Sequence, residues 1–341
     1  MVTCLARSAS DDGLLLSGSE DCSVRAWRWD EEENSHAVVG KHASAVWSTG
    51  VQSHLAVSTA TEAKLWDLRT SEPTTAFGAV RGRGGAALRT FNGHRGEVWC
   101  HHWSGGGQLV TGASDGRICS WDVETGHQTC TLEAHKESVF ALVQTDATAE
   151  LCLSASADAH CALWDLRSGK GSASHRWRAH RDMVFTAAWA GEYLVWTGSG
   201  DRGLSMWDLR RLPTQDGYKG VHLEPCRAVK TVQFAHEDSI WALSHCEGRL
   251  VSGGVDKLVK VWDDAAASDP ASGTNAGGLE LPGHQGPVFC TVTDQCNIFS
   301  GGSDGLVLVW DFHSDRGGSV RDIWDTGLGD PSLAAVLGEF S

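Results

Sequence analysis

Apolar runs of strand length recur along the chain, and polar turn residues separate them. In one example, residues 306–310 read Leu-Val-Leu-Val-Trp and follow a Ser-Asp-Gly turn. Short apolar runs between Gly, Ser and Asp residues are typical of β-strands joined by tight turns. No run of 18 apolar residues occurs, so the pattern contains no candidate transmembrane helix. The pattern predicts an all-β chain.

A sequence motif also recurs along the chain, with a longer period than that of the strands. One Trp-Asp dipeptide occurs in each repeat unit, and these dipeptides begin at Trp29, Trp66, Trp121, Trp164, Trp207, Trp262 and Trp310. Six of them are preceded by a Gly-His, Ala-His or Lys-His dipeptide, which places the histidines at His42, His94, His135, His180, His236 and His284. A repeat of this length predicts one supersecondary unit that is copied along the chain.

The tryptophan of the first unit has to be reassigned, because the spacing in the other units does not fit the Trp-Asp dipeptide of this unit. In units 3 to 7 an Asp lies six residues before the Trp, and a Ser or Thr lies ten residues before it. The same rule applied to Ser17 and Asp21 selects Trp27 as the equivalent tryptophan, not Trp29.

These repeats resemble the WD-repeat family, and the resemblance extends from Val2 to about Asp311. The resemblance implies a seven-bladed β-propeller in which each blade is a four-stranded antiparallel sheet. We name the strands of a blade a to d, from the central channel outward. The d–a and b–c connections then lie on one face, the top, and the a–b and c–d connections lie on the bottom. The three longest spacers, at about residues 70–85, 211–227 and 264–277, fall mainly in c–d connections on the bottom face.

Ring closure can be predicted from the two ends of the repeat region. Val2 already reads as strand a of blade 1, so no earlier residues remain to complete blade 7. Residues 319–324 are the candidate for the outer strand of that blade. We therefore expect a propeller over residues 1–325, a short tail over residues 326–341 and a seam between blades 1 and 7 without strand exchange.

Units 3 to 7 each combine His, Ser or Thr, Asp and Trp. The five sets are His94, Thr111, Asp115 and Trp121; His135, Ser154, Asp158 and Trp164; His180, Thr197, Asp201 and Trp207; His236, Ser252, Asp256 and Trp262; and His284, Ser300, Asp304 and Trp310. A catalytic triad uses similar residues, but it needs one exposed nucleophile rather than five copies. The resemblance instead implies an internal hydrogen-bond network in each blade. Unit 1 lacks the His, and unit 2 has Ala56 and Ala60 where the hydroxyl and the Asp belong, so blades 1 and 2 are predicted to be the least stable.

The net charge of the chain indicates which classes of partner it binds, and its cysteines indicate whether it holds a metal ion. With 28 basic and 43 acidic residues, the net charge is −15, which disfavours nucleic acid and anionic membranes and favours basic protein segments. The 11 cysteines include no Cys-x-x-Cys pair, so neither a zinc site nor another cofactor is indicated. Cys100 and His102 could share one face of a strand as metal ligands, but no further ligands are evident. We expect reduced thiols and a cytoplasmic or nuclear protein.

The fifth residue after each histidine is aromatic in all six cases. These residues are Trp47, Trp99, Phe140, Phe185, Trp241 and Phe289, and each follows a Val or Ile. Near the start of strand a they would form a partial collar around the top mouth of the channel, interrupted only at Thr3 in blade 1. Two interpretations are open: the collar binds a peptide that presents an Arg, a Lys or an apolar side chain, or the rings only fill the mouth.

A second candidate surface lies at the ends of three c strands. The sequence Trp-Asp-Leu-Arg occurs three times and ends at Arg69, Arg167 and Arg210. It resembles the motif with which WD-repeat substrate receptors bind the adaptor of cullin-4 ubiquitin ligases. The alternative is that each arginine stabilises its own c–d turn.

The resemblance and the composition together predict a non-enzymatic scaffold for protein–protein interactions. A substrate receptor of a cullin-type ubiquitin ligase is the more specific form of this prediction. A propeller with an enzymatic or nucleic-acid-binding site is the alternative. The first would need an isolated acidic or His cluster at the channel mouth, and the second a basic stripe. The Arg-Gly segment at residues 81–85 could be a weak RNA-binding element or a flexible loop.

Overall fold

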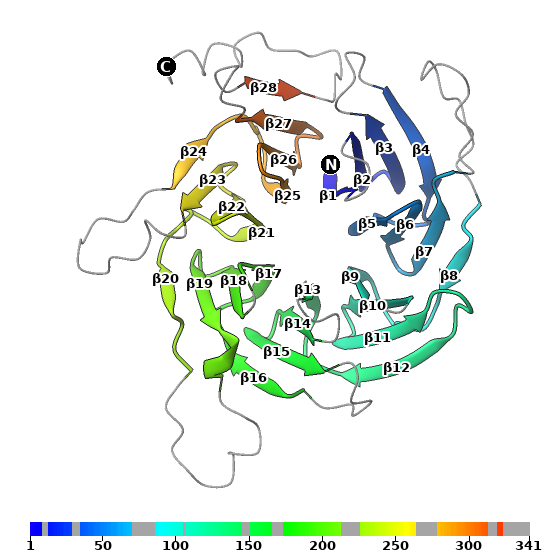
Figure 1. Cartoon of the computed structure of the whole chain (residues 1–341), viewed down its shortest axis with the longest axis horizontal. Coiled ribbons are helices and arrows are strands. Elements are labelled where there is room, and N and C mark those ends of the chain that lie inside the picture. Colours follow the sequence, from blue (N-terminus) through cyan, green and yellow to red (C-terminus); the bar gives the residue numbers. More distant parts are fainter. Residues whose placement is uncertain are drawn as a thin grey trace, which may run out of the picture.

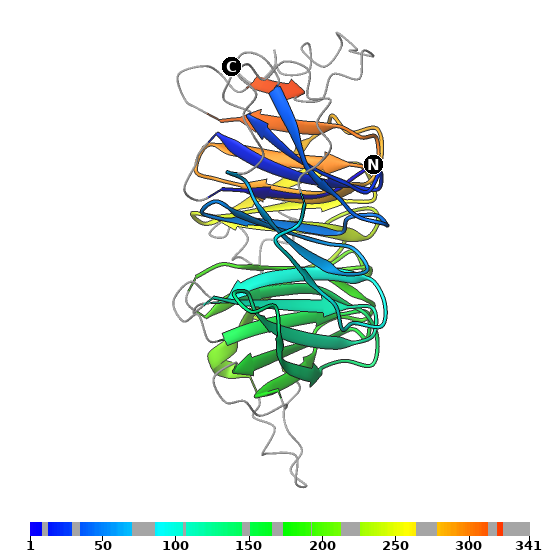
Figure 2. The ribbon, with the colours of Figure 1, turned by 90° about the vertical axis from the view of Figure 1, so that its right-hand side faces the viewer.

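The computed structural model describes residues 1–8, 13–28, 35–69, 86–104, 107–144, 151–165, 173–191, 193–212, 226–263, 278–312 and 319–322. Within these residues it contains 28 β-strands and one short 3-10 helix, η2 (Leu209–Arg211). The 28 strands form seven four-stranded antiparallel sheets, so the predicted seven-bladed propeller is confirmed. The blades surround a central channel (Figure 1), and the edge-on view shows a flattened ring (Figure 2).

Each blade takes four consecutive strands from the chain. Blade 1 contains β1 (Val2–Arg7), β2 (Leu14–Ser19), β3 (Ser23–Arg28) and β4 (Ser35–Lys41); blade 2 contains β5 (Ser48–Gln52), β6 (Leu55–Thr59), β7 (Ala63–Asp67) and β8 (Arg89–Phe91). Blade 3 contains β9 (Val98–Ser104), β10 (Gln108–Ala113), β11 (Arg117–Asp122) and β12 (Gln128–Glu133); blade 4 contains β13 (Val139–Gln144), β14 (Leu151–Ser156), β15 (His160–Asp165) and β16 (His175–Arg178). Blade 5 contains β17 (Val184–Trp189), β18 (Leu194–Ser199), β19 (Leu204–Asp208) and β20 (Lys230–Val232); blade 6 contains β21 (Ile240–Cys246), β22 (Arg249–Gly254), β23 (Val259–Asp263) and β24 (Leu279–Leu281). Blade 7 contains β25 (Val288–Thr293), β26 (Asn297–Gly302), β27 (Val307–Asp311) and β28 (Ser319–Asp322).

The hydrophobic core lies between blades. The described residues form seven clusters of buried side chains, and each cluster joins one pair of adjacent blades. The repeated tryptophan always belongs to the cluster that its blade shares with the preceding blade; Trp66 packs with Leu16 and Val24, for example. Since a single four-stranded sheet cannot bury both of its faces alone, the blades become stable only as a ring.

Blade 7 is completed from the C-terminal side, as predicted. Strand β28 pairs with β27, and Val320 lies opposite Trp310 in the register. The seam to blade 1 is closed by packing, because Val2, Leu5 and Trp27 form one cluster with residues of blade 7. A Cβ atom on Gly301 would lie 2.7 Å from Cγ1 of Val2, so glycine is what allows the first strand to approach β26 this closely.

The long spacers occupy the connections between β7 and β8, between β19 and β20, and between β23 and β24. These are c–d connections, in agreement with the sequence analysis. Most of their residues, the Arg-Gly segment at residues 81–85 among them, lie outside the described residues, and so does the proposed tail over residues 326–341.

Candidate protein-interaction surfaces

The repeated polar residues form a hydrogen-bond network in every blade. In all seven blades the indole Nε1–H of the tryptophan donates to a Ser or Thr hydroxyl, at 2.7–3.2 Å. In blades 2 to 7 a histidine Nε2 lies 2.7–2.8 Å from the same oxygen. One buried hydroxyl therefore serves two buried rings, which is a structural arrangement rather than an exposed nucleophile.

The aspartate completes this network in blades 3 to 7. In blade 5 both carboxylate oxygens of Asp201 lie 3.1–3.2 Å from Nδ1 of His180. The same carboxylate accepts backbone N–H groups from Arg181 and Gly203. Burial alone would raise the pKa of Asp201, but the hydrogen bond and charge of His180 and these backbone donors lower it to about 2.

The position of the aspartate links stability to surface geometry. The backbone N–H that follows the histidine belongs to the d–a connection, and the second N–H belongs to the b–c turn. Both loops lie on the top face. The equivalent bonds recur in blades 3, 4, 6 and 7. Each carboxylate thus holds two top-face loops together and gives the top face a fixed shape.

Blades 1 and 2 depart from this pattern in different ways. Trp27 donates to Ser17 at 2.8 Å, so the corrected register of blade 1 is confirmed. In blade 2, the prediction that the hydroxyl is missing is wrong, because Ser58 accepts from Trp66. The b–c turn of this blade is shorter: Thr59 pairs directly with Ala63, which moves the hydroxyl two residues closer to the tryptophan.

The aspartate of blade 2 is absent, as the sequence indicates. Nδ1 of His42 is buried and has no hydrogen-bond partner among the described residues. Burial is the main cause that lowers the pKa of His42 to about 4; the positive charge of Lys64 adds to it, and Glu62 opposes it. His42 therefore stays neutral without a carboxylate.

The structure brings the six predicted aromatic residues together. Five ring contacts connect them in chain order: Trp47–Trp99 at 4.4 Å, Trp99–Phe140 at 5.5 Å, Phe140–Phe185 at 5.2 Å, Phe185–Trp241 at 4.7 Å and Trp241–Phe289 at 5.1 Å between centroids. We call this set the aromatic collar. All six side chains are half-buried, so the rings pack on one another and keep part of their surface exposed. In blade 1 the buried Thr3 interrupts the collar.

The strand geometry explains why the rings point inward. The Val or Ile before each ring is buried between blades, as predicted; Val139 is an example, packing near Gly112 of the preceding blade. In blades 3 to 7 the register of strand a shifts at the aromatic residue, which is the mark of a β-bulge. A bulge leaves one residue without a partner across the strands and redirects its side chain. The bulge therefore frees the ring from the sheet at the channel mouth.

Four acidic residues precede collar residues on the d–a connections, and the sequence analysis did not single them out. Glu97, Glu137, Asp182 and Asp238 stand on the d–a connections two or three residues before an aromatic residue. Asp182 and Phe185 both approach Gly200, which places carboxylate and ring side by side. Among the described residues, none of these four carboxylates forms an ion pair. The collar thus combines exposed ring surface with unpaired negative charge.

The arginines of the Trp-Asp-Leu-Arg motif fold back on their own turns. Nε and Nη2 of Arg69 donate to the two carboxylate oxygens of Asp67 at 3.1 and 2.9 Å. Arg210 makes the same pair of bonds to Asp208, at 2.9 Å each, and lies over the ring of Tyr193. The guanidinium–carboxylate bonds agree with the turn-stabilising interpretation. The side chains of Arg69 and Arg210 are nonetheless 67% and 62% exposed. Arg167 lies outside the described residues.

Residues of the Cys100-His101-His102 segment form hydrogen bonds within the propeller. The thiol of Cys100 is buried and donates to the carbonyl oxygens of Gly112 and Val139. Nδ1 of His101 lies 2.8 Å from the hydroxyl of Ser48 in the adjacent blade. Among the described residues there is no group of three His, Cys, Asp or Glu side chains placed to hold a metal ion.

The helical part of the described chain offers no segment long and apolar enough to cross a membrane.

Comparisons with known proteins agree with this architecture. The chain is 30% identical over 182 residues to the protein tipD of Dictyostelium discoideum, which covers 53% of this chain and 27% of tipD. It is 26% identical to a ribosome biogenesis protein WDR12 homolog of Culex quinquefasciatus, over 75% of this chain and 61% of that protein. It is 30% identical to the U5 small nuclear ribonucleoprotein 40 kDa protein of D. discoideum, over 52% and 46%. The matches therefore span less than two thirds of each relative's length.

A solved structure and a family profile complete the comparison. The WD40 β-propeller domain of Doa1 superposes with a TM-score of 0.72 over 92% of this chain and 94% of that domain, at 21% identity, which shows the shared fold. The profile of the WD domain, G-beta repeat, matches residues 1–28, 85–122, 126–165, 227–263 and 278–311. Blade 2, with its short b–c turn and missing aspartate, lies almost wholly outside these segments. The chain belongs to the WD40-repeat family.

Proposed function

We propose that this protein is a non-enzymatic interaction scaffold whose top channel mouth holds a basic or apolar peptide segment of a partner. The observation that carries the proposal is the aromatic collar with its unpaired carboxylates. Aromatic residues are enriched at protein interfaces, and tryptophan is among the residues that most often supply the binding energy there. The faces of the rings attract cations, and nearby carboxylates strengthen that attraction.

The architecture supports a scaffold rather than an enzyme. The polar groups that could carry acid–base chemistry, the five Asp-His pairs, are buried and used within the blades. Their aspartates hold the loops around the collar in place. A preorganised surface binds with a smaller loss of conformational entropy, which is what a docking platform needs.

Replacing Trp99 and Trp241 together with Ala is expected to weaken peptide binding by at least about tenfold, since each ring contributes on the order of 1 kcal/mol. The measurement is fluorescence anisotropy with 12-residue peptides that carry a central Arg, Lys, Leu or Glu. The Arg, Lys and Leu peptides should bind the wild type more tightly than the Glu peptide does.

Trp103 provides the matched control, because it lies on the same strand as Trp99 but at the opposite end. Trp103→Ala should leave peptide affinity unchanged. If the double variant keeps its affinity and loses much of its thermal stability, the rings serve only as core and the proposal is wrong.

A second proposal concerns the bottom face. We infer that Arg69, Arg167 and Arg210 dock an adaptor of cullin-4 ubiquitin ligases, which would make the protein a substrate receptor. The supporting observation is the exposed guanidinium edge of Arg69 and Arg210, held in position by the preceding aspartate. A guanidinium fixed in this way can still donate to a partner carboxylate.

Co-purification of the adaptor tests this second role. Arg167→Ala combined with Arg210→Ala is expected to reduce adaptor recovery to background. Arg211→Ala is the control, because Arg211 is adjacent and exposed but lies outside the motif. Adaptor recovery that is equal for all variants, or absent for the wild type, would exclude the ligase role and leave the scaffold proposal intact.

The charge of the chain supports a class of partner, and the names of its relatives support a location. A net charge of −15 supports protein partners over nucleic acid or anionic lipid. Relatives include proteins named for ribosome biogenesis and for a small nuclear ribonucleoprotein. We propose a cytoplasmic or nuclear location for this chain.

A further inference from the structure

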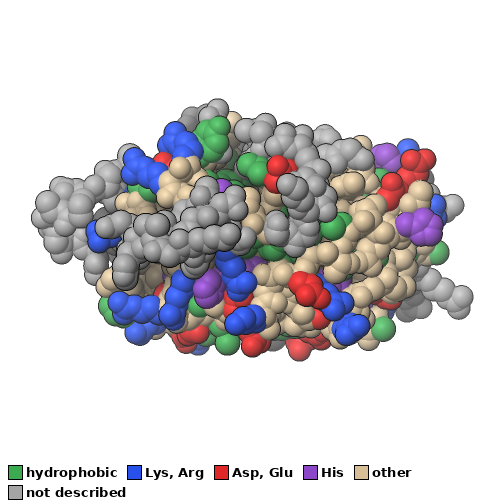
Figure 3. Space-filling model, turned by 90° about the horizontal axis from the view of Figure 1, so that it is seen from below, with side chains coloured by type: hydrophobic (Ala, Val, Ile, Leu, Met, Phe, Trp, Pro, Cys, Tyr) green, Lys and Arg blue, Asp and Glu red, His purple; other side chains and the backbone are tan. Residues whose placement is uncertain are grey.

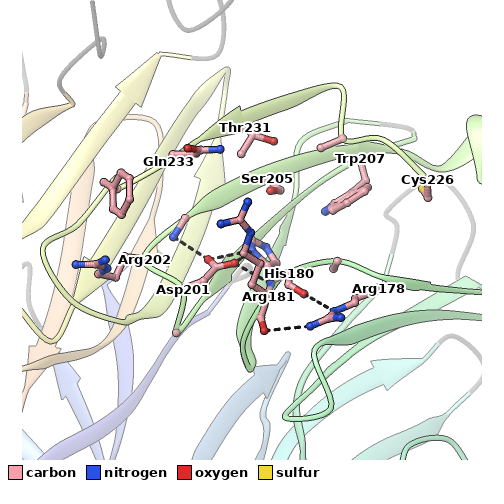
Figure 4. A pocket seen from close by; sticks show the side chains of 15 residues that line it. Arg178, His180, Arg181, Asp201, Arg202, Ser205, Trp207, Cys226, Thr231 and Gln233 are labelled. Atoms are coloured by element: carbon pink, nitrogen blue, oxygen red, sulfur yellow. Dashed lines mark hydrogen bonds and ion pairs between the residues drawn. The ribbon is translucent and has the colours of Figure 1, made fainter.

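A pocket of about 850 Å³ opens on blade 5, and no residue of the aromatic collar lines it. Its lining comes from the end of β16, the d–a connection that follows it, the b–c turn of blade 5 and the outer strand β20. Figure 4 shows Arg202 and Arg178 on opposite sides of this pocket, with Arg181 between them. The outer edge seen in Figure 3 carries Lys and Arg side chains toward blades 4 and 5. We call this pocket of blade 5 the rim pocket.

The three arginines differ in how their donors are used. Nε and Nη2 of Arg178 donate to the carbonyl oxygens of His180 and Arg181, so Arg178 supports the d–a connection. The guanidinium groups of Arg181 and Arg202 form neither a hydrogen bond nor an ion pair with any described residue. Both side chains are exposed. Two cationic forks with unused donors therefore border one pocket in a chain of net charge −15.

The carboxylate within the lining, that of Asp201, forms no ion pair with Arg181 or Arg202. Asp201 is bonded to His180 and to the backbone N–H groups of Arg181 and Gly203. Its lone pairs are thus directed into the blade. The neighbouring Asp182 binds the backbone N–H of Met183 and approaches Phe185 on the collar side. The rim pocket keeps a local positive charge beside an acidic channel mouth.

Phe234 adds an apolar element that the repeat does not explain. It is 64% exposed, the largest exposed fraction among the large hydrophobic residues described. Its φ of 55° lies in the left-handed region, which is unfavourable for an aromatic residue, and strained residues of this kind concentrate at functional sites. The φ of 68° at Arg202 is different, since the same turn position is positive in other blades, for example at Ala159 and Lys257. Phe234 stands two residues before His236, where blade 4 has Glu133 before its own histidine and blade 3 has Asn92.

Phe234 and Arg202 form one unit. The guanidinium carbon of Arg202 lies 4.9 Å from the centroid of the Phe234 ring. Stacking on an aromatic face orients a guanidinium and leaves its in-plane N–H donors available for a carboxylate. The ring surface beside it can cover an apolar side chain.

We propose that the rim pocket binds an acidic peptide segment of a partner protein, with Asp or Glu carboxylates on Arg181 and Arg202 and an apolar side chain against Phe234. The rim pocket would bind an acidic segment, whereas the aromatic collar is proposed to bind a basic or apolar one. The two sites consist of different residues. The chain then has two top-side contacts of opposite polarity, which favours partners whose basic and acidic segments follow one another.

The test uses the full chain and a fluorescein-labelled peptide, Gly-Glu-Asp-Leu-Glu-Asp-Gly. Its affinity for the wild type should fall with increasing salt. Arg181→Ala with Arg202→Ala should weaken binding by at least about tenfold, and Phe234→Ala by about fivefold. The peptide in which Gln and Asn replace Glu and Asp should not bind.

Arg95→Ala is the matched control, because Arg95 follows His94 as Arg181 follows His180 and lies at a blade without this pocket. It should change the affinity less than about twofold. Equal losses for Arg95→Ala and the double variant would show an unspecific charge effect, and displacement by millimolar inorganic phosphate would show a general anion site. Either result, or no binding by the wild type, overturns the proposal. Trp99→Ala with Trp241→Ala should leave this peptide's affinity unchanged, so the two surfaces are tested separately.

Discussion

Lowering the pH from 6.5 to 4 is expected to reduce the free energy of unfolding by about 3 kcal/mol through His42 alone. His42 is 7% exposed, and burial lowers its pKa from 6.5 to about 4. Its Nε2 atom lies 2.7 Å from the hydroxyl of Ser58, whereas Nδ1 has no partner among the described residues. The position of the network aspartate in blade 2 is occupied by Ala60, so no aspartate binds Nδ1 to stabilise the protonated ring.

The sign follows from proton binding in the two states. Between pH 6.5 and pH 4 the unfolded chain binds a proton at His42 and the folded chain does not, so unfolding becomes more favourable as the pH falls. The aspartates act in a lower window. The pKa of Asp201 is lowered from 3.8 to about 2, so its stabilising effect is present above pH 3.8 and is lost as the pH falls towards 2.

Urea titrations at several pH values, followed by circular dichroism, measure this effect. His42→Gln keeps a side-chain N–H near Ser58 but does not titrate, so its stability should fall less between pH 6.5 and 4. His101 is a second contributor in the same window, because burial and the charge of His102 lower its pKa to about 3. Identical pH profiles for the wild type and His42→Gln would show that His42 is not the acid-sensitive group.

The fold could be predicted from the sequence because the repeat displays its own register. A Ser or Thr ten residues before the tryptophan identified Trp27 over Trp29, and the structure places the indole of Trp27 on Ser17. The same spacing rule failed in blade 2, because it assumes a constant b–c turn. A turn shortened by two residues moves the hydroxyl to Ser58, and only strand pairing reveals this change.

The candidate sites were predictable to different degrees. The aromatic collar follows from a repeated position, since one strand geometry applies in every blade. The pairing of Arg210 with Asp208 was available as an alternative because the two residues are close in sequence. The rim pocket was not predictable. Arg202 and Phe234 are brought together by the pairing of β19 with β20 across a long insertion, and neither residue type is repeated at its position.

The hydrogen-bond networks also connect stability with docking. Each aspartate in blades 3 to 7 binds a d–a connection and a b–c turn, and these loops carry the carboxylates and arginines of both proposed surfaces. A loop held by a buried ionic group does not need to be ordered when a partner arrives. The d–a connection of blade 2 lacks this support, so its contribution to a fixed top face is smaller.

Removing one shared hydroxyl is expected to have the second large effect. Ser252 is fully buried and accepts Nε1–H of Trp262 at 2.8 Å, and Nε2 of His236 lies 2.7 Å from it. Ser252→Ala leaves both ring nitrogens buried without a partner. Each such atom costs about 1–3 kcal/mol, so the free energy of unfolding should fall by about 2–5 kcal/mol.

The repeat supplies the controls for this change. Thr occupies the equivalent position in blades 3 and 5, at Thr111 and Thr197, so Ser252→Thr keeps the hydroxyl in a side chain that the blade accommodates and should cost less than about 1 kcal/mol. Ser17→Ala in blade 1 removes a hydroxyl that serves Trp27 without a histidine, and it should cost about half as much as Ser252→Ala. Urea midpoints of the three variants at pH 7 give the comparison. If Ser252→Thr destabilises the propeller as much as Ser252→Ala does, packing rather than hydrogen bonding dominates at this position; equal costs for Ser17→Ala and Ser252→Ala would mean that the histidine adds nothing to the network.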